Sequence, residues 1–318
     1  MRCLQSPRYH PEPVGNPESE QWESSRGPDL IPGPLASGRF LAVGREQVVE
    51  VVDQARLHVL AVDDGVDEAV LLEELSGLES LGEVGLGGVA DDAGTGEADH
   101  GIGFGEDEVA DAVRDLKARG VTVSGGAVNV RDAEAYKAWL DRTVEELGGC
   151  DIFVPNVSAG GGMDSEKNWW KCFEVDVLHT VRGCEQLMPH LEKSGHGSIV
   201  IIGSTNALET FYAPMAYNAM KAALLTYSKQ LSQFIGRKNI RVNTVSPGPI
   251  YFEGGAWEMI KSTNQKMHDA TLKAMPNGRF GTPDEIARAV AFLASPAASI
   301  ITGANLVADN GFTKRVQY

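Results

Sequence analysis

From residue 107 to the C-terminus, short apolar runs alternate with longer segments in which apolar residues recur every three or four positions. Short apolar runs are typical of buried strands, and the longer period is typical of helices that bury one face. The predicted strands are 121–130, 150–156, 197–204, 240–248 and 304–309, and the predicted helices include 107–120, 132–149, 215–236 and 283–295. Strands that alternate with helices predict an α/β fold, a single domain with a doubly wound parallel sheet.

A longer apolar stripe lies between the predicted strands 150–156 and 197–204. Apolar side chains recur there at steps of three or four, which predicts one helix with a single apolar stripe. The members of the stripe are Trp170, Phe173, Val177, Val181, Cys184, Met188 and Leu191.

The first third of the chain differs in character from the rest. Residues 1–39 hold 5 acids and 4 bases, residues 40–106 hold 16 acids and 2 arginines, and residues 107–318 hold 23 acids and 22 bases. Residues 1–39 are rich in Pro, Gly, Ser and Glu, which predicts disorder. In the atypical acidic segment 40–106, "FLAVG", "EQVVEVVDQA" and "LHVLAVDD" predict a strand, a helix and a strand, an aberrant first βαβ unit. The alternative is a segment foreign to the fold, from a wrong start site or a frame error.

Composition excludes several kinds of protein. No apolar run is long enough for a transmembrane helix, and the N-terminus lacks the apolar stretch of a secretory signal. The four cysteines form no close-spaced pair and the seven histidines do not cluster. We therefore expect reduced thiols, a cytoplasmic location, no membrane association and no metal site. The net charge of −16 argues against nucleic acid as a partner.

Three residues carry the candidate chemistry. Ser204 ends a predicted strand, Tyr217 follows thirteen residues later, and Lys221 follows after four more, on the same helix face as Tyr217. A free tyrosine has a pKa of about 10, and a nearby positive charge lowers that value. Such a tyrosine can give or take a proton at a carbonyl or alcohol oxygen, and a serine hydroxyl can hydrogen-bond the same oxygen. Tyr-x-x-x-Lys alone would also suit an ordinary amphipathic helix.

With this spacing the chain resembles the short-chain dehydrogenase/reductase family, over about residues 107–318. "IRVNTVSPGPI" resembles the Pro-Gly turn that the family places beside the nicotinamide. "GRFGTPDEIARAVAFLASPAASIITGANLVADNG" resembles the C-terminal pattern of its 3-oxoacyl-reductase-like members. The resemblance implies a Rossmann-like sheet, here with an atypical N-terminal segment, NAD or NADP as cofactor, a small carbonyl or alcohol substrate, and a homo-oligomer, either dimer or tetramer.

The resemblance also implies catalytic roles. Tyr217 would be the general acid/base, Ser204 would polarise the carbonyl, and Lys221 would tune Tyr217 and hold the nicotinamide ribose. Asp176 falls where the family usually has an asparagine that anchors a proton-relay water. An aspartate can also hold that water, but its charge would pull on Lys221. The alternative for Asp176 is a solvated acid on a helix.

Further positions match the family's cofactor contacts. Asn129 and Val130 stand where Asp-Val usually flanks the adenine. Asn156 matches the second asparagine of the family's Asn-Asn-Ala-Gly strand end, where Pro155 replaces the first asparagine and Val157-Ser158 replace Ala-Gly. Simple turn chemistry is the alternative for Asn129 and Asn156.

The Pro-Gly turn supplies Pro247, Gly248 and Ile250 as cofactor contacts. Phe252 sits where the family commonly has a cofactor-contacting threonine, and the segment 249–280 corresponds to its substrate lid. Five apolar residues of this segment have two interpretations. They line an apolar substrate pocket, or they pack as ordinary helix residues. They are Tyr251, Phe252, Trp257, Met259 and Met267.

The stretch "AGTGEADHGIGFGED", residues 93–107, resembles a phosphate-binding loop. The family's loop, Thr-Gly-x-x-x-Gly-x-Gly, follows the first strand, and a helix and a second strand separate it from the helix that matches 107–120. Here Thr95-Gly96 and Gly101-Ile102-Gly103 are one residue too far apart and run directly into that helix. We interpret the stretch as a chance similarity. If 57–64 is the second strand, Asp63 or Asp64 would select NAD at its end.

The sequence therefore predicts an NAD(P)-dependent oxidoreductase that interconverts a carbonyl and a secondary alcohol by hydride transfer. Because no phosphate loop is recognisable, an alternative of another class stays open. It is a protein of similar fold that binds no dinucleotide, either a binding or scaffold protein or an inactive product of a misassembled reading frame.

Overall fold

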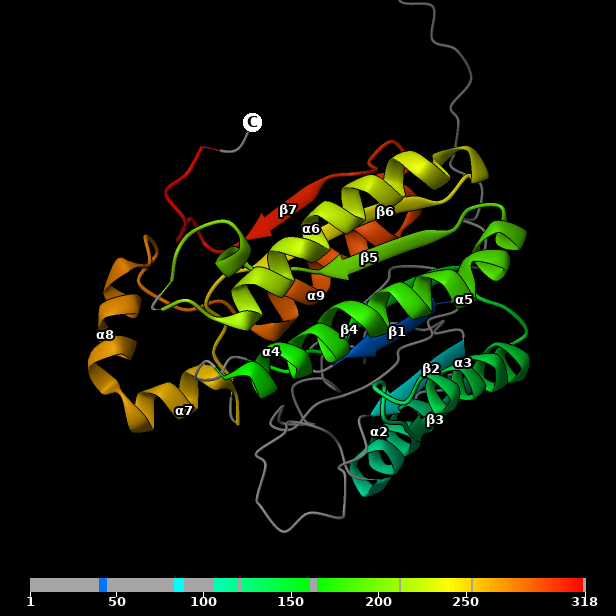
Figure 1. Ribbon diagram of the computed structural model, residues 1–318, viewed down its shortest axis with the longest axis horizontal. Helices are drawn as coiled ribbons and strands as arrows, with labels where there is room; N and C mark the ends of the chain where they lie inside the picture. Colours follow the sequence, from blue (N-terminus) through cyan, green and yellow to red (C-terminus); the bar gives the residue numbers. More distant parts are fainter. Residues whose placement is uncertain are drawn as a thin grey trace, which may run out of the picture. The chain divides into compact units, whose positions relative to one another are not determined.

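The computed structural model describes residues 40–44, 83–88, 106–118, 122–160, 165–211, 213–252 and 254–316, all within the compact unit Pro34–Tyr318. Their strands form one parallel sheet in the order β3-β2-β1-β4-β5-β6-β7 (Figure 1). The strands are β1 (Phe40–Gly44), β2 (Glu83–Gly88), β3 (Thr122–Ala127), β4 (Ile152–Asn156), β5 (Ser198–Ile202), β6 (Arg241–Pro247) and β7 (Asn305–Ala308). The order reverses between β1 and β4, which is the switch point of a doubly wound fold.

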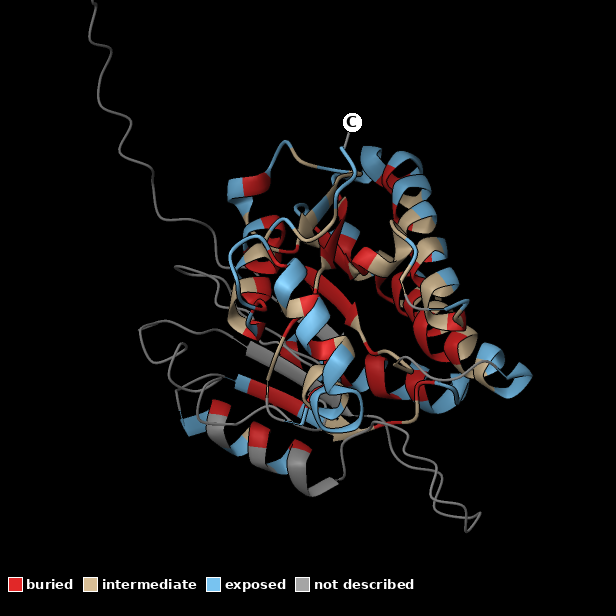
Figure 2. Cartoon of the chain, turned by 90° about the vertical axis from the view of Figure 1, so that its left-hand side faces the viewer, coloured by how far each residue is buried: buried red, intermediate tan, exposed pale blue. Residues whose placement is uncertain are grey.

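Helices cover both faces of this sheet, with α5 and α6 on one face and α9 on the other (Figure 1). The fold class predicted from the sequence is confirmed. The helices are α2 (Glu106–Ala118), α3 (Ala133–Leu147), α4 (Glu166–Cys172), α5 (His179–Ser194), α6 (Ala216–Ile235), α7 (Ala256–Thr263), α8 (Gln265–Ala274) and α9 (Pro283–Ala294). The core lies between the layers, where the central strands are buried (Figure 2).

The acidic N-terminal segment contributes two strands to the sheet. β1 is the predicted strand "FLAVG", and it pairs in parallel with β2 and with β4. The strand between β1 and β3 is Glu83–Gly88, whereas the predicted strand at 57–64 lies outside the described residues. Val84 and Leu86 alternate with glycines in β2, a pattern that the surrounding repeats of Leu, Glu, Val and Gly conceal. The predicted helix "EQVVEVVDQA", together with Asp63 and Asp64, lies outside the described residues.

Several helix ends follow directly from the sequence. The Asp132 carboxylate accepts hydrogen bonds from the Glu134 and Ala135 amides and begins α3, and Gly148 ends it in the left-handed conformation, with φ 73°. At α9, Thr282 and Glu285 form a capping box in front of a proline at the first helical position. These features explain why the boundaries of both helices are predictable.

The single helix predicted over the apolar stripe is interrupted. α4 and α5 are joined by a π-helix, Phe173–Leu178, which holds one more residue per turn than an α-helix. The predicted stripe is buried in α5, where Cys184 and Leu191 are fully covered, but it does not hold before the π-helix. Trp170 is 59% exposed, whereas Asp176 and His179 are buried. Polar residues face inward here because this part of the helix passes beside the candidate site.

Candidate active site

The candidate residues gather at one edge of the sheet. Asn156 and Pro247 are the last residues of β4 and β6, Ser204 follows β5, and Asn129 follows β3. The carboxyl ends of parallel strands meet at the same edge, which is where doubly wound folds bind their ligands. The topology thus brings together residues that are more than a hundred positions apart in the sequence.

Ser204 begins a single turn of 3₁₀-helix, Thr205–Ala207, directly after β5. Its hydroxyl oxygen accepts a hydrogen bond from the Asn206 amide at 3.1 Å, and the residue is only 7% exposed. This contact holds the side chain at the strand end with its hydroxyl hydrogen available for another acceptor.

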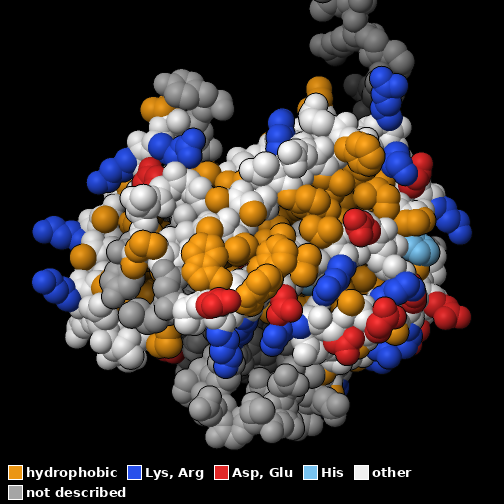
Figure 3. All heavy atoms as spheres, viewed as in Figure 1, with side chains coloured by type: hydrophobic (Ala, Val, Ile, Leu, Met, Phe, Trp, Pro, Cys, Tyr) orange, Lys and Arg blue, Asp and Glu red, His pale blue; other side chains and the backbone are white. Residues whose placement is uncertain are grey.

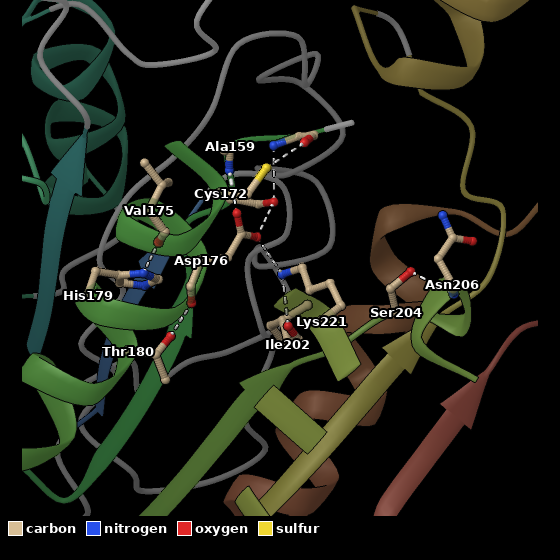
Figure 4. Close-up of polar contacts among 12 residues, drawn as sticks. Ala159, Cys172, Val175, Asp176, His179, Thr180, Ile202, Ser204, Asn206 and Lys221 are labelled. Atoms are coloured by element: carbon tan, nitrogen blue, oxygen red, sulfur yellow. Dashed lines mark hydrogen bonds and ion pairs between the residues drawn. The ribbon is translucent and has the colours of Figure 1, made fainter. Parts of the chain in front are cut away.

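Tyr217 and Lys221 lie in the first turns of α6. The Lys221 ammonium is 5.6 Å from the centre of the Tyr217 ring, so the expected proximity of the two side chains is present. Lys221 is 3% exposed and donates to the carbonyl oxygen of Ile202, the last residue of β5, at 3.1 Å (Figure 4). This bond ties the beginning of α6 to the end of β5.

Asp176 lies in the π-helix and points toward Lys221 (Figure 4). Its Oδ1 is 3.3 Å from the Lys221 ammonium and accepts a hydrogen bond from Ser158 Oγ at 2.7 Å. Its Oδ2 accepts from the Ala159 amide at 3.1 Å. Asp176 is fully buried, so the alternative of a solvated helix acid does not apply. The expected pull of its charge on Lys221 takes the form of a buried ion pair.

His179 is a buried residue beside this network that the sequence did not single out. Its Nδ1 contacts the Val175 carbonyl oxygen one turn earlier (Figure 4). Its ring packs edge-on against Tyr136. Burial lowers the pKa of His179 to about 3, with a smaller contribution from the positive charge of Lys221. The imidazole is therefore neutral at physiological pH.

The residues expected beside the adenine are placed by turn contacts. The side-chain oxygen of Asn129 accepts a hydrogen bond from the Arg131 amide at 3.0 Å. The backbone carbonyl oxygen of Asn129 accepts one from the Asp132 amide, also at 3.0 Å. This is the turn chemistry named as the alternative for Asn129. Val130 is buried at 1% exposure and Asn156 is half-buried at the end of β4. Their contacts to a cofactor stay predictions.

The turn after β6 is tightly packed. Gly248 donates from its amide to the Ala308 carbonyl oxygen at 3.0 Å. A Cβ atom on Gly248 would lie 2.5 Å from the Cβ of Asp309, so only glycine fits at this position. Ile250 is 8% exposed and bridges to Gly281. The Pro-Gly turn is thus fixed between β7 and the segment before α9.

The segment that contains α7 and α8 carries an aromatic cluster. Trp257 stacks on Phe280 with ring centres 5.0 Å apart and meets Phe211 at 6.1 Å. Tyr251 and His268 complete the cluster around Phe280. Phe211 belongs to the segment between Ser204 and Tyr217, so the cluster connects α7 to the candidate site. The sequence did not single out Phe211, His268 or Phe280.

The remaining predicted lid residues behave differently from one another. Phe252 packs its ring where a Cβ atom on Gly255 would lie, and Met267 is half-buried. Met259 is 58% exposed, which argues both against a covered pocket lining and against ordinary helix packing.

Thr95 to Gly103 lie outside the described residues. In the chain they stand between β2 and α2, whereas the family's phosphate loop follows the first strand. Within the described part of the chain, no helix combines the length and apolar character needed to cross a membrane. Among the same residues, no group of three or more His, Cys, Asp or Glu could hold a metal ion.

The doubly wound parallel sheet is that of a Rossmann-like protein, and Tyr217 and Lys221 lie beside each other at its carboxyl edge. The sequence profile of the family described as enoyl-(acyl carrier protein) reductase matches residues 100–313. The chain belongs to the short-chain dehydrogenase/reductase family of oxidoreductases. NAD or NADP, the expected cofactor, is the cofactor of this family.

The chain is similar to several known proteins. It is 34% identical over 195 residues to isoepoxydon dehydrogenase patN of Penicillium expansum, covering 61% of this chain and 75% of that protein. It is 34% identical over 226 residues to the 3-oxoacyl-[acyl-carrier-protein] reductase FabG of Chlamydia muridarum, covering 67% of this chain and 88% of that protein. The fold matches that of L-sorbose reductase from Gluconobacter frateurii, solved with NADPH and L-sorbose, with a TM-score of 0.68 and 24% identity over 89% of this chain and 99% of that one.

Proposed function

We propose that this protein is an NAD(P)-dependent oxidoreductase that interconverts a carbonyl compound and a secondary alcohol. The observation that carries the proposal is the geometry around Lys221. Its buried ammonium lies 5.6 Å from the Tyr217 ring centre and is held by the Ile202 carbonyl and by Asp176. A phenol beside a fixed positive charge is suited to exchanging a proton with a substrate oxygen.

Each residue has a distinct part in this proposal. Tyr217 gives a proton to the carbonyl oxygen during reduction and takes it back from the alcohol during oxidation. Ser204 donates a hydrogen bond to the same oxygen and so stabilises the charge that develops there. Lys221 favours the phenolate of Tyr217 and holds the nicotinamide ribose. Asp176 holds Lys221 and anchors the water from which the proton is replaced.

The residues at the strand ends fit a nicotinamide cofactor. One buried ammonium and the two hydroxyls of Ser204 and Tyr217 provide the donors and acceptors that ribose hydroxyls and a carbonyl require. The bound cofactor would supply or accept the hydride. Asn129, Val130 and Asn156 would hold its adenine side, and Pro247, Gly248 and Ile250 its nicotinamide side. NAD and NADP are equally compatible with these residues.

The substrate is a small molecule bound between the catalytic residues and the lid. The ring centres of Phe211 and Trp257 are 6.1 Å apart, so aromatic side chains line this side of the proposed site. The names of the similar proteins include a dehydrogenase, an acyl-carrier-protein reductase and a sugar reductase. This range favours the carbonyl and alcohol class without selecting one compound.

We also propose that the protein is a homo-oligomer, either a dimer or a tetramer, in the cytoplasm. Large apolar side chains are exposed on α4 and α6, with Trp169 at 40%, Trp170 at 59% and Phe234 at 86%. Hydrophobic side chains gather on the face formed by α5 and α6 (Figure 3). Symmetric association that covers such a face is the common outcome in soluble proteins.

Cofactor titration tests the proposal. We expect the purified full-length chain to shift the fluorescence of NADH or NADPH and then to oxidise that cofactor when ketones or aldehydes are added. Binding of neither NADH nor NADPH would contradict it and favour the alternative, a binding or scaffold protein of the same fold. Binding without turnover on any carbonyl would separate a nucleotide-binding protein from an enzyme.

A further inference from the structure

Two departures from the family's pattern contact each other in this protein. Ser158 stands where the family has glycine, and Asp176 stands where it usually has asparagine. They are separated by 18 positions, yet Ser158 Oγ donates to Asp176 Oδ1 at 2.7 Å. The contact joins the loop after β4 to the π-helix.

The Asp176 carboxylate depends on this contact because it is fully buried. A buried carboxylate is tolerated only when its oxygens receive hydrogen bonds and a compensating charge. Here Oδ2 receives the Ala159 amide, and Oδ1 receives the Ser158 hydroxyl and lies 3.3 Å from the Lys221 ammonium. Of these donors, only the Ser158 hydroxyl would be lost with glycine at its position.

The Ser158 hydroxyl is itself oriented. The Gly160 amide donates to Ser158 Oγ at 3.2 Å, which occupies an acceptor site of the hydroxyl and directs its hydrogen toward Asp176. Gly160 has φ 68°, in the left-handed region that glycine adopts without strain. The backbone after β4 is thus shaped to present the hydroxyl to the carboxylate.

We propose that Ser158 is a positioning residue that acts through Asp176. Its hydroxyl fixes the plane of the carboxylate so that Oδ1 holds the Lys221 ammonium beside Tyr217. An asparagine at position 176 is neutral, so burying its side chain without this donor costs less, and the serine and the aspartate form one functional pair. The expected effect of Ser158 on turnover rests on the proposed function. The contact between Ser158 and Asp176 is independent of that function.

A double-mutant cycle tests the pair. Ser158→Ala removes only the hydroxyl, and we expect kcat to fall about tenfold, the usual effect of losing a hydrogen bond to a charged group. In an Asp176→Asn background, the same Ser158→Ala change should lower kcat by less than about twofold. Ser158→Thr keeps the hydroxyl and should retain activity. Ser194→Ala removes a hydroxyl that donates to the Leu191 carbonyl and accepts from the His196 amide at the end of α5; it is the matched control and should leave kcat unchanged.

Thermal unfolding of the same variants, without substrate, gives a second readout. Ser158→Ala should lower the melting temperature by about 4 °C when Asp176 is present and by much less in the Asp176→Asn background. Equal losses of kcat or of melting temperature in the two backgrounds would overturn the pairing, as would a Ser158→Ala protein with unchanged kcat. If the unaltered protein oxidises neither NADH nor NADPH, the proposed function fails, whereas the thermal cycle still decides whether Ser158 acts through Asp176.

Discussion

His179 makes the stability of the protein depend on pH through a single side chain. Its pKa is about 3 in the folded protein and near 6.5 in an unfolded chain, because burial disfavours the charged form. Above pH 6.5 both states are neutral and the residue contributes no pH dependence. Between pH 6.5 and pH 3 the unfolded chain binds the proton and the folded protein does not, so stability falls with falling pH.

We therefore expect His179→Asn to lose part of the acid sensitivity of the protein. The unaltered protein should lose about 1.4 kcal/mol of unfolding free energy from this residue for each pH unit below 6.5. Urea unfolding at pH 7 and pH 5 measures the difference. His190→Asn, at a half-buried position on α5, is the control and should keep the full sensitivity. If the His179 variant loses the same unfolding free energy between pH 7 and pH 5 as the unaltered protein, another group is responsible for the acid sensitivity.

Tyr217→Phe removes the proposed proton donor and leaves the apolar ring in α6. Turnover should fall by at least about a hundredfold, the usual worth of a positioned acid or base. The fluorescence titration with NADH or NADPH should change far less, because the hydroxyl is not the only contact to the cofactor. A variant with the rate of the unaltered enzyme would exclude Tyr217 as the general acid/base.

At the scale of elements, the aromatic cluster links α7 to the catalytic segment. Trp257→Ala breaks the contacts with Phe211 and Phe280, each worth about 0.5–1.5 kcal/mol for an aromatic pair. We expect KM for the carbonyl substrate to rise about tenfold while kcat changes less, since the ring acts in binding rather than in proton transfer. Met259→Ala on the same helix should leave both constants unchanged. A change confined to kcat in the Trp257 variant would contradict a role in binding.

The start of α9 is stabilised by an ion pair between Arg279 and Glu285. Arg279 donates two hydrogen bonds to Glu285, at 2.8 Å and 2.6 Å, and Glu285 also accepts from the Thr282 amide. The hydrogen bonds from Arg279 lower the pKa of Glu285 from 4.5 to about 2. A lowered carboxyl pKa contributes stability above pH 4.5 that is lost as the pH falls toward 2.

Glu285→Gln should accordingly lower the melting temperature at pH 7. The pair is partly exposed, so we expect a loss of only about 1 kcal/mol, or about 2–4 °C. The difference from the unaltered protein should shrink as the pH is lowered below 4.5. Glu145→Gln, an exposed change in α3, is the reference. A difference that stays constant with pH would show that the charge of Glu285 does not contribute.

At the scale of the whole molecule, the exposed apolar side chains predict association. Light scattering at micromolar concentration should show a dimer or a tetramer. A Trp170→Glu, Phe234→Glu double variant should shift the protein toward monomer, because it replaces exposed apolar side chains of α4 and α6 with charged ones. A strictly monomeric unaltered protein would refute the oligomer.

The N-terminal third predicts weak cofactor binding. No recognisable phosphate loop stands in residues 1–106, and phosphates bind best to amides at a helix N-terminus. Replacing residues 1–106 with the strand, glycine loop, helix and strand of a related reductase should therefore tighten NADH or NADPH binding. Micromolar affinity in the unaltered chain would show that residues 40–106 already build a nucleotide site.

The sequence predicted most of the fold because strands and helices from residue 107 onward have distinct periods and clear caps, as at Asp132, Gly148 and Thr282. It placed Tyr217, Lys221 and Asp176 together because i and i+4 share a helix face and the family pattern marks position 176. It missed the π-helix, since an extra residue per turn leaves no mark in an apolar pattern. It missed His179, and it marked Ser158 only as a departure from the family's pattern, because the contact with Asp176 joins positions 18 residues apart.

The π-helix has a consequence for how this site tolerates length changes. Removing Val177 or Leu178, which lie between Asp176 and α5, would leave an ordinary α-helix with α5 still packed on the sheet. Each residue of an α-helix turns by about 100°. The turn that carries Asp176 would therefore rotate away from Lys221, and no side-chain replacement would return it. Natural variants of this chain should accept many substitutions at the half-buried residues Phe173, Glu174, Val177 and Leu178, but no deletion of Val177 or Leu178.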